Sequence, residues 1–256
     1  MIGTLETRAL LLDTHPFREA DLVVRLFLPD RGNLSAMARS ARSSRKRFPS
    51  GLDRLTLADI KLSSRTGRGM PTLEEANVVE VWWNIRSDVG RVAAASLLAE
   101  LLLRAHLEAD EAPALHAFAC ALLARLDSVH EVAGGPAALM AAAGILHRLR
   151  LLPRPLACTR CACATPLTQG SPSDAWLDPS TGELLCGPHA EHRPGGIRLE
   201  RHELQLLALA EGDPTDFPLG PDLSPIAEPL LDRFEPFLVR MFGGNLRSLA
   251  FLRDVR

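Results

Sequence analysis

The hydrophobic pattern of this 256-residue chain changes near residue 84, and the change limits the folds open to it. Before that point, short segments rich in β-branched and apolar residues alternate with turn residues, which is typical of strands. The sequence predicts strands over residues 3–13, 21–29, 34–38, 52–63 and 72–82. Asp30-Arg31-Gly32-Asn33 predicts a hairpin turn, because glycine adopts a positive φ without strain. Five short strands in about 80 residues favour a small closed barrel such as the OB-fold.

After Asn84 the pattern becomes helical. Alanine- and leucine-rich stretches with helical periodicity predict helices over residues 88–107, 112–126, 137–151, 201–211 and 226–242. Glycine and proline separate these stretches, as expected at helix ends. The chain therefore predicts an α+β protein in which an N-terminal barrel precedes an α-helical domain, with the boundary between residues 84 and 85.

A run of cations interrupts the strand-rich region. The segment from Arg39 to Phe48 contains no carboxylate, and its five cations are Arg39, Arg42, Arg45, Lys46 and Arg47. Residues 31–68 carry a net charge of +8, although the whole chain carries −2. This asymmetry indicates a polyanionic partner, and the alternative is a basic face that contacts only water.

If the partner is a nucleic acid, we expect the five cations to bind phosphates with little sequence preference and a steep salt dependence. Arg31 and Arg54 would extend the track, followed by Arg65 and Arg68. Aromatic partners are scarce, because the chain has no tyrosine and this region offers only Phe17, Phe27 and Phe48. Phe27 lies in an apolar run typical of a core, so Phe48 is the candidate for base stacking.

Two pairs of potential ligands predict a zinc site. Cys158-Thr-Arg-Cys161 and Cys186-Gly-Pro-His189 are separated by 24 residues. Paired ligands with two intervening residues are how a chain commonly supplies a tetrahedral zinc. The predicted set is Cys158, Cys161, Cys186 and His189, in an insert over residues 156–192. Cys163 or His192 could replace His189, and the remaining alternative is a loop of reduced, unliganded thiols.

The sequence gives little support for a secreted protein, a membrane protein or an enzyme. We expect no signal peptide, and the apolar stretch 92–103 is too short to span a bilayer, so a cytoplasmic protein is predicted. The sequence holds no glycine-rich phosphate loop with lysine and no Ser/His/Asp arrangement. Four protein ligands would leave no open position for catalysis on zinc. We therefore expect a protein that is not an enzyme, with one structural zinc.

The order of these parts resembles the bacterial RecO family of DNA repair proteins over essentially the whole chain. The likeness is carried by Leu34-Ser-Ala-Met-Ala-Arg39-Ser-Ala-Arg42 after the Asp-Arg-Gly turn, and by the Cys-x-x-Cys insert. It is also carried by Leu246-Arg247-Ser248 with Phe251-Leu252 near the end. Zinc-binding members of that family usually use four cysteines, whereas His189 stands fourth here.

The resemblance implies an OB-fold domain, a helical bundle and a zinc module. It implies binding to single- and double-stranded DNA, annealing of complementary strands, and a nucleoid-associated location. With RecR, such a protein helps to load RecA onto strands coated by single-stranded-DNA-binding protein, and RecF is a further candidate partner. The alternatives are an RNA-binding or transcription-associated OB/zinc protein and, less favoured, a zinc-dependent nuclease.

Overall fold

The computed structural model describes residues 2–65, 69–108, 110–153, 157–161, 174–190 and 195–255. The chain forms two compact units. One contains residues 1–87 and 105–127, and the other contains residues 88–104 and 128–256. The predicted domain division at residues 84 and 85 stays a prediction. Residues 105–127 lie beyond that division but group with the barrel.

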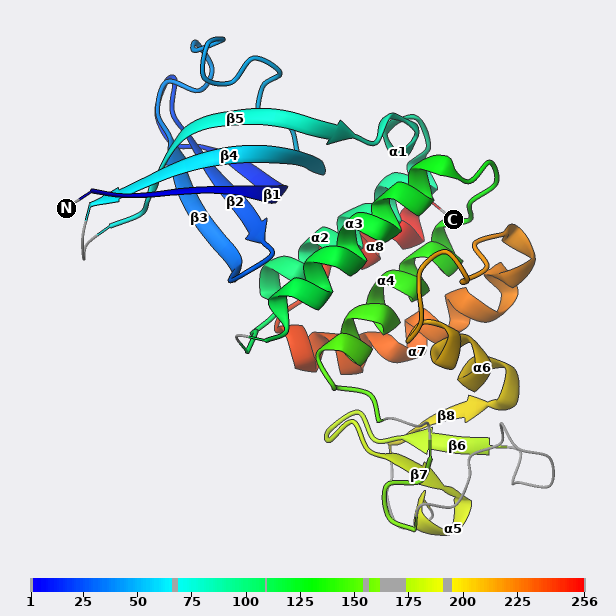
Figure 1. Ribbon diagram of the computed structural model, residues 1–256. Helices are drawn as coiled ribbons and strands as arrows, with labels where there is room; N and C mark the ends of the chain where they lie inside the picture. The colour runs from blue at the N-terminus through cyan, green and yellow to red at the C-terminus, as the bar shows by residue number, and fades with distance from the viewer. Residues whose placement is uncertain are drawn as a thin grey trace. The chain divides into compact units, whose positions relative to one another are not determined.

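The first unit is built on a closed five-stranded barrel (Figure 1). Its strands are β1 (Ile2–Pro16), β2 (Leu22–Leu28), β3 (Gly32–Ala38), β4 (Thr56–Arg65) and β5 (Thr72–Val81). They follow the order β1-β2-β3-β5-β4, and β4 pairs with β1 to close the barrel. Only β3 and β5 pair in parallel among the described strands. This arrangement confirms the predicted five-stranded barrel.

The predicted hairpin between β2 and β3 is confirmed by their register, in which Leu28 pairs with Gly32. Gly32 has a φ of +68°, and a Cβ at this position would lie 2.2 Å from a methyl group of Leu107. The positive φ favours glycine here, and a larger residue would also force the flexible end of the Leu107 side chain to move. Alternate strand residues such as Leu26 and Ile60 point into the barrel core.

Two helices complete this unit, α1 (Trp83–Ser87) and α3 (Ala112–Ser128). The carboxylate of Asp127 accepts a 2.7 Å hydrogen bond from the Asn84 backbone N–H, which joins the ends of the two helices. On α3, the His116 ring stacks on Phe27 of β2 with 6.3 Å between centroids. These contacts explain why α3 belongs with the barrel.

The second unit is helical, and its main helices are α2 (Val89–Arg104), α4 (Gly134–Arg148), α6 (Arg201–Leu209), α7 (Ser224–Phe242) and α8 (Arg247–Asp254). A short 3-10 helix, η1 (Pro221–Leu223), precedes α7. Helix α4 is almost wholly buried and packs against α2 and α7. A Cβ at Gly134 would lie 3.1 Å from Gly90 Cα, so α2 approaches the start of α4 closely. The predicted helices are all present, and α8 is an additional one.

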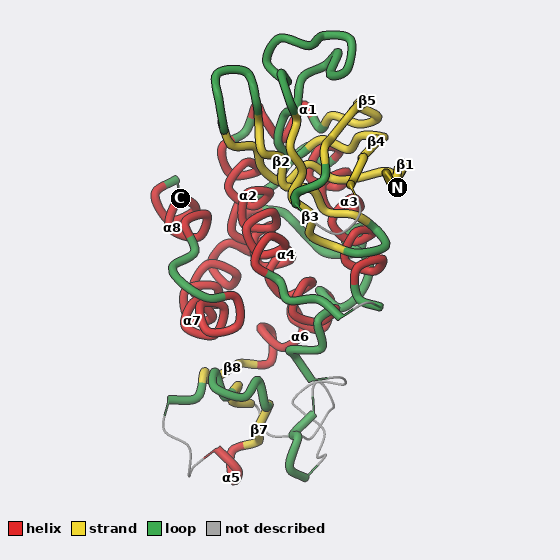
Figure 2. Tube along the Cα trace, turned by 90° about the vertical axis from the view of Figure 1, so that its left-hand side faces the viewer, coloured by secondary structure: helices red, strands yellow, loops and turns green. Residues whose placement is uncertain are grey.

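A small sheet also belongs to the second unit. Its order is β7 (Leu184–Cys186), β6 (Asp174–Leu177) and β8 (Ile197–Glu200) (Figure 1). Helix α5 (Gly187–Ala190) follows β7 (Figure 2). Strand β7 ends at Cys186, the first residue of the second ligand pair. In the part of the chain that the structure describes, no helix has both the length and the apolar character needed to span a bilayer.

Glu100 links α2 to the start of α8. Its carboxylate accepts hydrogen bonds from the backbone N–H groups of Arg247 at 3.2 Å and Ser248 at 2.8 Å, and from the Ser248 hydroxyl. Arg104 pairs with the same carboxylate at 2.5 Å. Burial tends to raise the pKa of Glu100, but the hydrogen bonds from Ser248 and Arg247 and the charge of Arg104 outweigh it and lower this pKa.

Replacing Glu100 with glutamine should reduce the free energy of unfolding by about 2 kcal/mol at pH 7, because charge-assisted hydrogen bonds to α8 are lost. A carboxylate with a lowered folded pKa stabilises the protein above its unfolded pKa of about 4.3, and this contribution disappears as pH falls through the folded value. Urea unfolding over a series of falling pH values should therefore show a difference in the free energy of unfolding between wild type and variant that is largest at pH 7 and shrinks as pH falls. The exposed Glu80, changed to glutamine, serves as a control.

Candidate metal centre and basic surface

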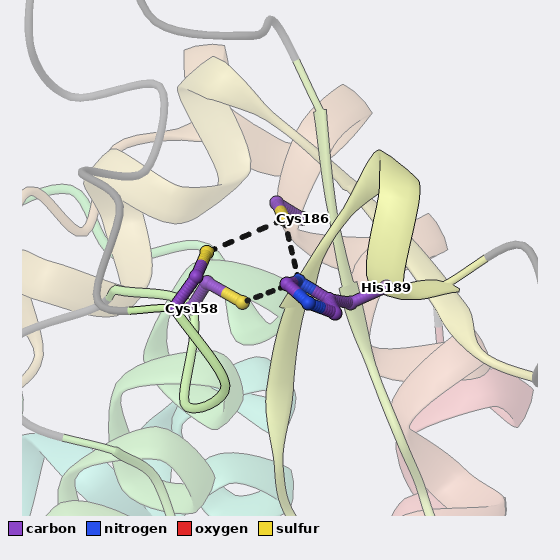
Figure 3. Close-up of side chains that lie close together, drawn as sticks. Cys158, Cys186 and His189 are labelled. Carbon is purple, nitrogen blue, oxygen red and sulfur yellow. Dashed lines mark hydrogen bonds between the residues drawn. The ribbon is translucent and has the colours of Figure 1, made fainter.

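The two ligand pairs come together at the edge of the small sheet. Cys158 and Cys161 lie in a turn that is joined to β7 by a 2.8 Å hydrogen bond from the Thr159 N–H to the Leu184 carbonyl. Cys186 ends β7, and His189 lies in the short helix α5 that follows. The four ligand atoms lie within 4.8 Å of one another. Figure 3 shows the side chains of Cys158, Cys186 and His189 converging.

The spacing of these atoms fits a tetrahedral zinc. Zinc–sulfur bonds of about 2.3 Å and a zinc–nitrogen bond of about 2.0 Å need sulfur–sulfur edges of about 3.8 Å and sulfur–nitrogen edges of about 3.5 Å. The Sγ atoms of Cys161 and Cys186 are 3.8 Å apart. Nδ1 of His189 lies 3.6 Å from the Cys158 Sγ and 3.2 Å from the Cys186 Sγ. This group could therefore hold one metal ion, and its three thiols and one imidazole suit zinc.

The surroundings of Cys158 favour its thiolate, the form that binds metals. Burial of this side chain, which is 2% exposed, acts to raise its pKa. The backbone N–H groups of Cys186, Cys161 and Arg160 hydrogen-bond to the sulfur and outweigh burial, so the pKa of Cys158 is lowered to about 6. The alternative ligands Cys163 and His192 lie outside the described residues, and His189 occupies the fourth position without them.

The predicted cationic segment lies in the connection between β3 and β4, residues 39–55, which contains neither helix nor strand (blue at the top of Figure 1). We call residues 39–55 the basic connection. The side chains of Arg39, Arg42, Arg45 and Lys46 are exposed. Over the described ranges, none of these four forms an ion pair with a carboxylate. Their charges therefore face solvent together.

The basic connection is held in place by hydrogen bonds. The Ser40 N–H donates to the Asp21 carboxylate at 2.7 Å, and the Arg42 N–H donates to the Ala20 carbonyl at 3.2 Å. Arg47 is only partly exposed, and its guanidinium donates to the Arg39 carbonyl at 2.5 Å and to the Ser44 hydroxyl at 3.2 Å. Arg47 thus helps to shape the connection.

Phe48 corrects one prediction. Its side chain is 3% exposed and packs in the barrel core beside Leu52. The Arg47 carbonyl accepts a 3.1 Å hydrogen bond from the Ala76 N–H on β5, which draws the next residue into the barrel. A buried ring has no free face on which a base can stack, so Phe48 is not carried into the proposed DNA-binding surface.

Arg31 and Arg54, the two candidates for extending the cationic track, lie in different parts of the barrel unit. Arg31 lies at the start of β3, roughly 25 Å of extended strand from Arg39, and pairs with Asp30 at 2.9 Å. Arg54 is the last cation of the basic connection and lies 3.9 Å from the Asp13 carboxylate. Arg54 therefore shares the connection with the four exposed cations, whereas Arg31 does not. Arg68 and the side chain of Arg65 lie outside the described residues.

Two family models match this chain, one over the barrel strands and one over the residues that follow them. A family model described as "Recombination protein O N terminal" matches residues 1–82, and one described as "Recombination protein O C terminal" matches residues 86–221. The chain belongs to the RecO family. It therefore has a role in DNA repair and recombination.

Individual RecO proteins align over nearly the whole chain. The "DNA repair protein RecO" of Anaeromyxobacter dehalogenans strain 2CP-C is 33% identical over 93% of this chain and 92% of its own length. The "DNA repair protein RecO" of Anaeromyxobacter sp. strain Fw109-5 is 35% identical over 100% of this chain and 98% of its own length. That of Myxococcus xanthus is 28% identical over 96% of both chains. The sequence resemblance to RecO is thus confirmed.

Proposed function

We propose that this RecO-family protein binds single- and double-stranded DNA through the basic connection and anneals complementary strands. The observation that carries the proposal is the group of four exposed cations, Arg39, Arg42, Arg45 and Lys46, on a loop held by its own hydrogen bonds. Phosphate contacts of this kind carry no sequence information and release condensed counterions. Such a surface suits a repair protein that acts on any sequence.

Annealing follows from charge alone, without bond chemistry. Two complementary strands repel each other through their phosphates, and this repulsion falls when cations neutralise part of the charge. Strands held on the same cationic surface then pair more readily. We further propose, from family membership, that the protein acts with RecR to help RecA load onto strands coated by single-stranded-DNA-binding protein, with RecF as a further partner.

The proposed metal is a single structural zinc held by Cys158, Cys161, Cys186 and His189. When bound, zinc would cross-link the turn at residues 157–161 to β7 and α5 by four coordinate bonds. The donor set supports a structural role, because four protein ligands complete a tetrahedron and leave no position for a reacting water. We accordingly propose that the protein is a mediator and not a nuclease.

A strand-annealing assay tests the proposed function. Two complementary oligonucleotides, one labelled, should pair faster with the protein than without it, and the acceleration should decline steeply as salt rises because counterion release drives binding. An equal-length RNA competitor should displace the DNA no better than unlabelled DNA does. No acceleration at low salt, or a clear preference for RNA, would count against DNA annealing and favour the RNA-binding alternative.

A further inference from the structure

Among the phenylalanine and tryptophan residues in the described part of the chain, three have exposed side chains. They are Phe17 at 54%, Trp83 at 68% and Phe251 at 38%. Phe251 belongs to the helical unit, whereas Phe17 and Trp83 belong to the unit that contains the barrel. By contrast Trp82, the neighbour of Trp83, is only 5% exposed. The exposure of Trp83 is therefore a property of that one position.

Phe17 lies at the first end of the basic connection. It begins the loop between β1 and β2, and the two hydrogen bonds from Ser40 and Arg42 to residues 20 and 21 join this loop to the connection. The guanidinium of Arg18 lies 5.5 Å from the centroid of the Phe17 ring. An exposed ring with a cation over it thus adjoins the exposed arginines.

Trp83 lies at the other end of the same connection. It begins α1, and the guanidinium of Arg86 lies 5.3 Å from the centroid of its ring. Arg86 donates hydrogen bonds to the Asp53 carboxylate at 3.0 Å and to the Arg54 carbonyl at 3.5 Å. The last residues of the basic connection are therefore joined to the second exposed aromatic residue.

The neighbouring carboxylates do not cancel the cationic character of this surface. Asp21 accepts the Ser40 N–H, Asp53 accepts Arg86, and Asp13 lies 2.9 Å from His15 and 3.9 Å from Arg54. Asp13 and Asp53 thus pair with groups outside the set of four cations. Over the described ranges, none of the four cations forms an ion pair with a carboxylate. An aromatic ring beside unpaired cations fits nucleic acid better than it fits an apolar protein surface.

We propose that Phe17 and Trp83 are base-stacking residues for single-stranded DNA, one at each end of the basic connection. This inference rests on the proposed DNA binding and adds a second kind of contact to it. Proteins that bind single strands combine a cationic track for the backbone with aromatic rings on which bases stack. In a duplex the bases already stack on one another, so the two rings contact single strands only. Pairing removes the bases from the rings and favours release of the duplex.

The test compares wild type, Phe17→Ala and Trp83→Ala on three probes of about 20 nucleotides: a single strand, the same strand without bases, and a duplex. Each substitution should raise the Kd for the normal single strand about 5- to 150-fold, as expected for a lost stacking contact. The Kd for the abasic strand and the duplex should change less than about twofold. The number of phosphate contacts is unchanged, so the salt slope should also stay the same.

Conservative variants separate stacking from structure. Phe17→Trp and Trp83→Phe should keep single-strand affinity near that of wild type, and Phe251→Ala should leave it unchanged. An equal loss on the abasic strand, or no loss on the normal strand, overturns the stacking proposal, and the second result points to a protein partner for these rings. If the wild type binds none of the three probes, the proposed function fails as well, so the two failures are distinguishable.

Discussion

Replacing Arg39, Arg42, Arg45 and Lys46 with alanine should weaken single-strand binding about 10²- to 10³-fold near 0.1 M salt. Each phosphate contact on a single strand contributes about −0.7 to the slope of log K against log salt, so four lost contacts should reduce the slope by about 3. The side chains are exposed and form no ion pairs over the described ranges, so stability should change little. Fluorescence anisotropy across a salt series measures both quantities.

A charge-preserving variant provides the matched control. Changing the three arginines, Arg39, Arg42 and Arg45, to lysine keeps the charge and should keep the salt slope, because counterion release depends on charge more than on hydrogen-bond geometry. Arg47 is left intact in both variants, since its hydrogen bonds to Arg39 and Ser44 shape the connection. An alanine variant with an unaltered slope would show that the DNA lies elsewhere on the protein.

Replacing Cys186 with serine should abolish zinc binding, from about one ion per chain to none. Serine is not a thiolate donor, and the apparent free energy of structural zinc binding at neutral pH is about 10–16 kcal/mol in small zinc modules. The strands around the site have only three or four residues each, so they need the cross-link more than a larger sheet would. Hydrogen exchange of residues 174–190 should therefore become much faster, while the barrel strands keep their protection.

Two further variants sharpen this experiment. His189→Cys gives four thiolate ligands and should retain zinc, since zinc accepts either donor set. Cys120→Ala removes a thiol from α3, outside the cluster, where burial raises the pKa of Cys120 to about 11, and zinc content should not change. Stoichiometric zinc in the Cys186→Ser protein would remove Cys186 from the ligand set.

The barrel strands and the ligand cluster were predictable from local patterns. Alternating apolar residues mark a strand with one buried face, and Gly32 marks the β2–β3 turn because its backbone requires positive φ. Two ligand pairs with fixed spacing predict a cluster even without a core. Each of these signals lies within a few residues of sequence. They can therefore be recognised without knowledge of the tertiary structure.

The exposure of the aromatic residues was not predictable in the same way. Phe48 is next to five cations in the sequence but is buried, because a hydrogen bond from Ala76 on β5 to the preceding carbonyl brings this part of the chain to the barrel. Trp82 and Trp83 are adjacent, yet only the first is buried. Such outcomes depend on contacts between distant segments. Helix α8 was likewise not predicted, because its eight residues make only about two turns.

The hydrogen bonds that hold the basic connection have a consequence for how it meets DNA. Ordering a flexible segment of backbone costs about 1–2 kcal/mol per residue, which a disordered basic tail must overcome on every encounter. Here Ser40, Arg42 and Arg47 fix the backbone before DNA arrives. The protein thus presents its cations as a preorganised surface, and little of the attraction to phosphate is consumed in shaping the loop.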